Sequence, residues 1–285
     1  KLKAPLAVQY NATDLVKYDF TKQDIQHLDQ KYNIESDEHV FCFVGRLTLL
    51  KNILFIVDAL KIVKAKGLKF KMFFVGTGTD EDKLKQAIVN NGLENEIILT
   101  GRLTDKRALG EFYNRAELLL FPLPYDTDGL VKYEAACYKT PAVSIKGFYC
   151  SSNIVDNYTG YLSNNNVKDY ADKILEIYNN KDLYEQVCKN CQENLYLTWD
   201  NSIEKIYNDY LIIIDKYKKG YFKELRKFVT NKNFHAKKIR NRKKQKSKKI
   251  DKQIKIKAEQ REKLERQIEK QTEKLEKLKK KSENL

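Results

Sequence analysis

Two carboxylic acids, Asp126 and Glu134, stand eight positions apart on either side of the turn 129–131, just after the apolar run 118–122. Carboxylate oxygens accept hydrogen bonds from hydroxyl groups, so such a pair is suited to hold a sugar or the vicinal diol of a ribose. A glycine in the turn lets the backbone come close to a ligand. The stretch therefore predicts a binding site for a ligand that carries hydroxyl groups.

The same residues also allow a purely structural interpretation. If residues 130–138 form a helix, Glu134 is an acid of the first helical turn, which the helix dipole favours without any ligand. Asp126 and Asp128 are common turn formers. Spacing alone does not separate this interpretation from a site in which the helix amides face a phosphate.

A second group of residues offers positive charge. Gly45 and Arg46 follow an apolar run, and Lys51 comes shortly after them, where a helix is expected to begin. An arginine fork and a lysine charge beside a helix start would form a cradle for phosphate oxygens, and the alternative is a surface turn whose cations are solvated. Gly76 and Gly78 follow the next apolar run and indicate either a tight turn or a close ligand contact.

Strand-like runs and amphipathic segments alternate along the chain and must position these residues. The runs are short and apolar, as is typical of buried parallel strands, and comprise residues 39–45, 70–76, 96–101, 118–122 and 141–145. The helical segments comprise residues 52–66, 80–91, 106–115, 130–138, 169–179, 183–195 and 201–216. This alternation predicts an α/β fold with a doubly wound, Rossmann-like parallel sheet, whose ligand sites lie at the carboxyl ends of the strands.

Charge is unevenly distributed along the 285 residues. Residues 216–285 hold 28 Lys and Arg against 9 Asp and Glu, whereas residues 1–215 hold 26 against 30. The basic character therefore belongs to a carboxyl-terminal tail. Five cysteines, an odd number, and the absence of a long apolar run favour a reduced, cytoplasmic protein without a membrane-spanning helix.

The tail itself contains two kinds of sequence. Lys and Arg dominate residues 236–249, with aromatic residues upstream, and this composition suits an anionic membrane surface or a nucleic acid. In residues 250–285 Glu and Lys are mixed with leucines at heptad-like spacing, which indicates either a weak coiled coil that mediates oligomerisation or a solvated single helix. A soluble charged extension is a further interpretation of the whole tail.

Five segments resemble, in order and spacing, the signatures of retaining glycosyltransferases of family 4, which have the GT-B fold and take sugars from nucleotide diphosphate donors. The segments are GRLTLLKN (45–52), VGTGTDEDKLK (75–85), IILTGRL (97–103), LLLFPLPYDTDGLVKYEAACYKTPAV (118–143) and NYTGYL (157–162). The resemblance spans roughly residues 38–215 and implies the carboxyl-terminal, donor-binding domain of such an enzyme.

The resemblance also implies a role for each matching residue. Arg46 and Lys51 match the basic pair that holds the donor diphosphate and neutralises the leaving group. Asp126 and Glu134 match the two-glutamate motif of the family, in which the first acid contacts the donor sugar and the second grips the ribose. Further matches line the nucleotide or approach its phosphates and sugar: Gly45, Gly76, Arg102, Leu103, Gly129, Leu130 and Val131.

The substrates and location implied by the resemblance follow from the family. A UDP-sugar is the expected donor and a GDP-sugar the second choice, with no metal or other cofactor. Because many relatives glycosylate lipids or lipid-linked glycans, the tail is expected to bind a membrane rather than nucleic acid. We therefore expect a cytoplasmic protein, peripheral at the inner membrane face, with a lipid-borne acceptor.

Two departures from the family pattern leave an alternative open. Asp126 replaces the usual first glutamate, which shortens the reach of the carboxylate by about 1.5 Å and puts the sugar preference in doubt. The acceptor domain is expected to be missing, so the predicted parts are a linker (1–37), the nucleotide-sugar-binding domain (38–222) and the basic helical tail (223–285). A degenerate domain that serves as a non-catalytic scaffold or partner subunit is the alternative, although the retained basic pair and ribose acid favour an enzyme.

Overall fold

The computed structural model describes residues 9, 11–125 and 128–219. Residues 8–209 form one compact unit, and the described residues 210–219 belong to a second unit. Asp126 and the tail 223–285 lie outside the described residues, so the expectations placed on them stay predictions.

A six-stranded parallel sheet forms the centre of the compact unit, in the order β3-β2-β1-β4-β5-β6. The strands are β1 (His39–Val44), β2 (Phe70–Val75), β3 (Ile97–Gly101), β4 (Leu118–Phe121), β5 (Ala142–Ile145) and β6 (Tyr161–Ser163). This order confirms the predicted doubly wound sheet. Only β6 had no predicted counterpart, because three residues are too few to show a strand pattern in the sequence.

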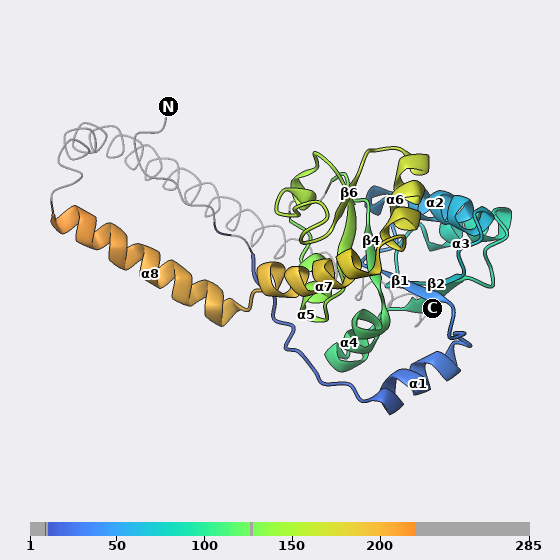
Figure 1. The fold of residues 1–285 in the computed structure, drawn as a ribbon, viewed down its shortest axis with the longest axis horizontal. Helices are drawn as coiled ribbons and strands as arrows, with labels where there is room; N and C mark the ends of the chain where they lie inside the picture. Colours follow the sequence, from blue (N-terminus) through green and yellow to red (C-terminus); the bar gives the residue numbers. More distant parts are fainter. Residues whose placement is uncertain (1–8, 10, 126–127, 220–285) are drawn as a thin grey trace, which may run out of the picture. The chain divides into compact units, whose positions relative to one another are not determined.

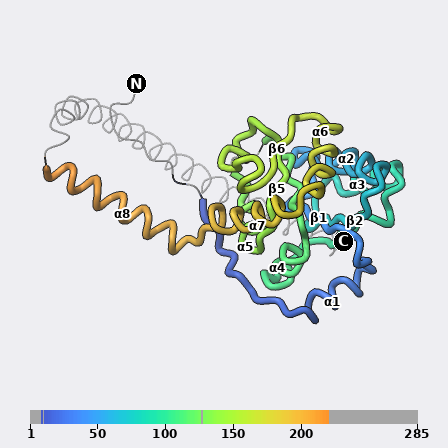
Figure 2. Tube along the Cα trace, in the orientation of Figure 1, coloured from blue at the N-terminus to red at the C-terminus, as the bar shows by residue number. Residues whose placement is uncertain are grey.

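Helices cover both faces of the sheet (Figure 1). Contacts group α2 (Ile53–Ala65), α3 (Glu81–Asn90) and α6 (Val167–Ile177) on one face. They group α1 (Lys22–Lys31), α4 (Lys106–Arg115), α5 (Val131–Cys137) and α7 (Lys181–Leu195) on the other. The trace in Figure 2 shows how the chain returns to the first face with α6 before it crosses back with α7.

Helix α1 lies inside the segment that was predicted to be a linker. Thr21 caps it by accepting a hydrogen bond from Asp24 N, and the Asp24 side chain accepts from Thr21 N at 2.7 Å, so both halves of a capping box are present. Leu28 is buried against the core. The rings of Tyr32 and Phe73 lie 5.0 Å apart, which fixes the end of α1 against β2.

The central strands are buried on both faces, as their continuous apolar sequences predict. Phe41, Phe43 and Phe74 have at most 1% of their surface exposed. Their side chains alternate between the two faces, so each helix layer has an aromatic floor to pack against. This packing leaves the carboxyl ends of the strands, where the chain must change direction, as the part of the sheet that loops shape.

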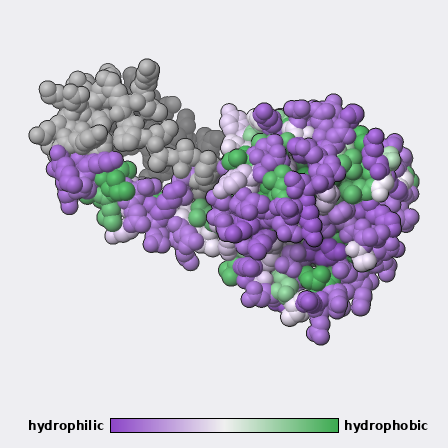
Figure 3. Space-filling model, viewed as in Figure 1, coloured by the Kyte–Doolittle hydropathy of each residue, from purple (hydrophilic) through white to green (hydrophobic). Residues whose placement is uncertain are grey.

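The last described helix, α8 (Trp199–Lys218), differs from the others because it exposes apolar side chains. Several of these are large: Ile203, Tyr207, Tyr210, Leu211, Ile212, Ile213, Ile214 and Tyr217. Figure 3 shows hydrophobic groups along this helix, whereas most of the visible surface of the described residues is hydrophilic. Among the described residues, no helix combines the length and apolar character needed to cross a membrane.

Candidate functional site

The strand order places β1 beside β4, and the chain leaves this pair toward opposite edges of the sheet. In doubly wound sheets the crevice at this point, outside the carboxyl ends of the strands, is where ligands bind. Asn52 joins its two sides, because its Nδ2 donates to Pro122 O at 2.9 Å. Asn52 has a left-handed backbone (φ 58°), which asparagine tolerates better than most residues. The sequence reasoning did not single out Asn52, whose only signal was its place just before a helix.

Backbone hydrogen bonds fasten together the loops that follow β1, β2 and β3. They join Gly45 N to Val75 O (3.0 Å), Leu47 N to Thr77 O (3.0 Å), Asp80 N to Leu47 O (3.1 Å) and Gly76 N to Gly101 O (2.9 Å). A Cβ atom on Gly76 would lie 1.9 Å from Gly45 O, and the φ of Gly76 is +142°. A side chain is therefore excluded at Gly76 by its neighbouring backbone, which supports the tight-turn interpretation of this glycine.

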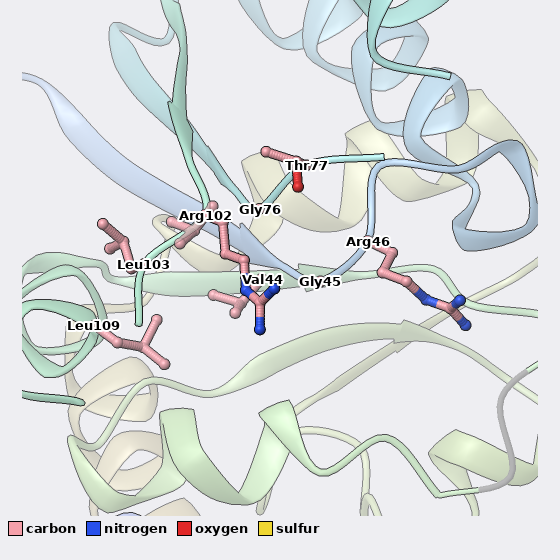
Figure 4. A pocket seen from close by; sticks show the side chains of 9 residues that line it. Val44, Gly45, Arg46, Gly76, Thr77, Arg102, Leu103 and Leu109 are labelled. Carbon is pink, nitrogen blue, oxygen red and sulfur yellow. The ribbon is translucent and has the colours of Figure 1, made fainter. Parts of the chain in front are cut away.

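A cleft of about 460 Å³ opens above these loops (Figure 4). Its lining residues come from the carboxyl ends of three strands and from α4: Val44, Gly45, Arg46, Val75, Gly76, Thr77, Arg102, Leu103 and Leu109. The structure thus brings together the predicted residues Gly45, Arg46, Gly76, Arg102 and Leu103. Its apolar walls and few polar groups are typical of a pocket for a flat organic ligand.

The two arginines of the cleft extend from different loops (Figure 4). Arg102 follows β3 and directs its guanidinium toward the end of β1, whereas Arg46 extends away from Arg102. Lys51 lies further along the chain, in the 3-10 turn η1 (Leu49–Lys51), and does not line the cleft. The predicted basic pair therefore occupies the same loop, with only Arg46 at the wall of the cleft.

On the other side of the crevice, Glu134 is held by a buried tyrosine. The hydroxyl of Tyr113 on α4 donates to Glu134 Oε2 at 2.8 Å. Burial raises the pKa of the Glu134 carboxyl above its ordinary value, while the hydrogen bond from Tyr113 and the charge of Lys106 oppose that rise. Burial and the neighbouring Glu134 charge raise the pKa of Tyr113 well above its ordinary value, so it stays a donor. Sequence reasoning found Glu134 but missed Tyr113.

The turn 129–131 connects this acid to the end of β4. Gly129 has a φ of +71°, and a Cβ atom there would lie 2.2 Å from the ring of Phe121. Glycine is thus required by backbone conformation and by packing. Val131 begins α5, and Leu130 is 46% exposed. Asp126, the predicted first acid, is outside the described residues and its place in the site stays a prediction.

A cluster of polar groups, here called the turn clamp (Asp128, Lys132, Tyr133 and Cys150), lies beside this turn and was not predicted as functional. The ammonium group of Lys132 lies 3.1 Å from Asp128 Oδ1 and donates to Cys150 O at 2.6 Å. The hydroxyl of Tyr133 donates to the same Asp128 oxygen at 2.7 Å. The sequence signal that could have revealed the pair is the i,i+4 spacing of an acid and a lysine on an otherwise apolar helix.

The charge state of Asp128 follows from these contacts. Burial, the largest single influence, raises its pKa, but the hydrogen bonds from Tyr133, Lys132 and Asn11 together lower the pKa below its ordinary value. Asn11 Nδ2 donates to Asp128 Oδ2 at 2.8 Å. Asp128 is therefore an ionised anchor with both carboxylate oxygens occupied, which agrees with its interpretation as a turn former.

Metal chemistry has no obvious ligand set in the part of the chain that the structure describes. No group of three or more His, Cys, Asp or Glu side chains there is arranged to hold a metal ion. The cleft instead offers guanidinium groups and backbone, which suit an anionic ligand.

Comparison with known proteins gives a family match. Residues 24–194 match the profile of the family described as "Glycosyl transferases group 1". The poly(ribitol-phosphate) alpha-N-acetylglucosaminyltransferase of Staphylococcus aureus is 30% identical over 161 residues, which cover 55% of this chain and 32% of that protein. The alpha-monoglucosyldiacylglycerol synthase of Streptococcus pneumoniae is 24% identical over 231 residues, 79% of this chain and 51% of that protein.

Solved structures support the fold. The Anabaena protein HepE, in complex with UDP and glucose, superimposes with a TM-score of 0.62 at 20% sequence identity, and the match covers 72% of this chain and 56% of that one. The chain therefore spans between about a third and just over half of the length of these relatives. At this identity the structural likeness shows the shared fold alone.

Proposed function

The chain belongs to the glycosyl transferases group 1 family, and from this premise we propose that it forms the nucleotide-sugar-binding part of an enzyme that transfers a sugar to an acceptor. The observation that carries the proposal is the cleft at the carboxyl ends of β1, β2 and β3, which gathers Gly45, Arg46, Gly76, Arg102 and Leu103. A cleft at this edge of a doubly wound sheet is where a nucleotide is expected.

Each side chain has a task in this proposal. Arg46 and Lys51 bind the donor diphosphate and stabilise the charge that develops on the leaving group. Glu134 accepts hydrogen bonds from the ribose diol, since Tyr113 occupies its Oε2 and orients the carboxylate. Asp126 contacts the hydroxyl groups of the donor sugar. The backbone of the turn 129–131 approaches the phosphates and the sugar.

The donor is proposed to be a UDP-sugar, with a GDP-sugar as the second choice. The support is the binding of UDP and UDP-glucose by the HepE structures, which share this fold. Transfer with retention of configuration, as in the family 4 enzymes that the sequence resembles, is part of the same proposal. The chain then represents the carboxyl-terminal, donor-binding half, and an acceptor-binding half completes the enzyme.

A lipid-borne acceptor at the inner membrane face is the proposed setting of the reaction. Two features support it: the Streptococcus pneumoniae relative is named as a diacylglycerol glycolipid synthase, and the basic sequence of residues 223–285 suits an anionic surface. The exposed apolar side chains of α8 would add hydrophobic contact with such a surface. We expect removal of residues 223–285 to reduce binding to anionic vesicles and to leave donor affinity unchanged.

Titration calorimetry of the full chain with UDP, GDP, UDP-glucose and GDP-mannose tests the donor site. Arg46→Ala and Glu134→Gln should each weaken binding of the preferred donor about 10- to 100-fold, because each removes a charge-assisted hydrogen bond. Arg115→Ala is the matched control, since Arg115 ends α4 at the amino edge of β4 and pairs with Asp29 at 2.6 Å. It should leave affinity unchanged.

Three outcomes decide the proposal. Selective binding of one nucleotide family, weakened in both site variants and not in the control, supports a donor site. Equal affinity of Arg46→Ala, Glu134→Gln and the unchanged chain would reject the assigned residues. A folded chain that binds none of the four compounds would reject donor binding by this chain and favour a scaffold role.

A further inference from the structure

The side chain of Lys132 is fully buried, with 0% of its surface exposed, at the beginning of α5. Its ammonium group contacts Asp128 Oδ1 and Cys150 O and lies 4.9 Å from the centre of the Tyr133 ring. A buried cation is costly unless it is paired and hydrogen-bonded, and these contacts meet that requirement.

Stability alone does not account for a lysine at this position. Replacing a buried ion pair by apolar side chains of similar volume is often neutral or stabilising, so a methionine at position 132 together with a neutral residue at position 128 could fill the same space. A cation adds direction, because charge-assisted hydrogen bonds hold their acceptors at short, defined distances. The useful question is therefore which groups Lys132 holds in place.

Those groups lie at both ends of the loop between β4 and α5. The thiol of Cys150, in the 3-10 turn η2 (Tyr149–Ser151), donates to Leu123 O at 2.9 Å, where the loop leaves β4. The carbonyl of the same Cys150 accepts from Lys132, where α5 begins. One residue of η2 thus fastens the entrance and the exit of the loop.

A second contact closes the turn across its mouth. Asp128 and Lys132 are four residues apart and bracket the turn 129–131, whose first residue has a left-handed backbone. Tyr133 strengthens this closure, because its hydroxyl donates to Asp128 and accepts from Asn153 Nδ2 at 2.8 Å. The turn clamp consequently fixes the backbone of the turn from outside, without a side chain of its own in the cleft.

From this geometry we propose that Lys132 is a positioning residue for donor binding. It holds the turn 129–131, and with it Glu134 two residues further along α5, in the orientation in which they meet a nucleotide sugar. The inference rests on the proposed function, because it assigns the orientation of that same site to Lys132. Lys132 acts through Asp128 and Cys150 and does not touch the ligand.

The test separates orientation from stability in a cycle of variants of the full chain. Lys132→Met, Asp128→Asn and the double variant are compared with the unchanged chain in two measurements, the affinity for UDP-glucose by calorimetry and the midpoint of urea unfolding. Lys132→Met should lower both quantities, because it leaves Asp128 buried without its cation. The double variant should regain stability, because it removes the charge mismatch, yet bind the donor about tenfold more weakly than the unchanged chain.

Lys173→Met is the matched control, since Lys173 lies on α6 with 15% of its side chain exposed and pairs with Glu176 at 2.9 Å. It should bind the donor normally. A double variant whose affinity recovers together with its stability would overturn the proposal, because Lys132 would then act only on folding. Normal affinity in Lys132→Met would overturn it as well.

Two further results are informative. If Lys132→Met does not fold, the double variant carries the test alone, by the same criterion. If the unchanged chain binds UDP-glucose and GDP-mannose equally poorly, the proposed function itself fails, and that result is distinguishable because it precedes any comparison of variants.

Discussion

The two sides of the candidate site are held together by different kinds of contact. On the side of β1, β2 and β3, backbone bonds backbone, and Gly76 allows the loops to touch. On the side of β4 and β5, buried polar side chains such as Lys132 and Asp128 tie the loop to η2 and α5. Each side can be perturbed without altering the contacts of the other, which makes the comparison testable.

The difference teaches how the two sides tolerate change. A contact between two backbones leaves no room for any side chain, so one added methyl group at Gly76 must displace a strand end. A polar side-chain cluster tolerates replacement if all its charges are removed together, and it fails when only one partner is removed. We therefore expect steep, uniform losses on the first side and losses on the second side that depend on the partner.

Gly76→Ala should give the largest effect and would break the comparison if it did not. The added Cβ would lie 1.9 Å from Gly45 O at a φ of +142°, so we expect a loss of about 3 kcal/mol or more in the free energy of unfolding, measured in urea. Gly67→Ala is the control, because Gly67 also has a positive φ (+88°) but open space around it. It should cost about 1 kcal/mol. Equal losses in the two variants would show that the backbone contact is unimportant.

Replacement of Asn52 sharpens the comparison, because this residue joins the two sides. Asn52→Ala loses the bond to Pro122 O and strains the left-handed backbone, so it should destabilise the chain by about 2 kcal/mol. Asn52→Gly loses the same bond but relieves the strain and should cost about 1 kcal/mol. Unfolding in urea measures both values. If the two variants are equally stable, the backbone conformation at this position has no energetic weight.

Tyr113→Phe removes one hydroxyl from the side-chain half of the site. We expect it to cost about 1 kcal/mol of stability and to weaken donor binding severalfold, because Glu134 loses the donor that orients it. Tyr184→Phe is the control, since its hydroxyl donates at 3.1 Å to Glu117 O at the amino edge of β4. It should cost similar stability with no change in affinity. A similar fall in affinity in both variants would contradict the orienting role of Tyr113.

The smallest expected effects are opposite dependences of stability on pH. The folded-state pKa of Glu134 is raised by burial, so its contribution to stability is full below its unfolded pKa, near 4.5, and is lost as the pH rises through the folded value. The folded-state pKa of Asp128 is lowered, because its hydrogen bonds outweigh the opposing effect of burial. Its contribution is therefore present above about pH 3.8 and is lost as the pH falls.

Urea unfolding between about pH 3 and pH 7 measures these dependences. The stability of the unchanged chain relative to Glu134→Gln should fall as the pH rises. Relative to the Lys132→Met/Asp128→Asn double variant, which leaves no lysine without its partner, it should rise over the lower part of the range. Slopes of the same sign for the two comparisons would contradict the opposite environments of the two acids.

The sequence was informative where the signal is local. Alternating apolar runs and helical segments predicted five of the strands and the doubly wound order, because burial on both faces leaves a continuous apolar run. Gly45, Arg46 and Arg102 were found because they directly follow such runs, where a parallel sheet must place its ligand site.

The contacts that escaped prediction depend on chain segments far apart in sequence. Nothing near Tyr113 indicates that its hydroxyl meets Glu134, and nothing near Lys132 indicates the carbonyl of Cys150, 18 positions away. Helix α1 was missed because its short amphipathic pattern is weak, although the capping box at Thr21 was a usable signal.

The bonded glycine loops also have a thermodynamic consequence for a ligand. Their backbone dihedral angles are fixed when the chain folds, so the conformational entropy of Gly45, Leu47 and Gly76 has already been lost before any ligand arrives. A nucleotide that enters the cleft on this side orders none of these positions again and retains more of its interaction free energy as affinity. Adaptation to different donors then falls to side-chain rotamers at the rim, such as those of Arg46 and Arg102, and not to the loops beneath them.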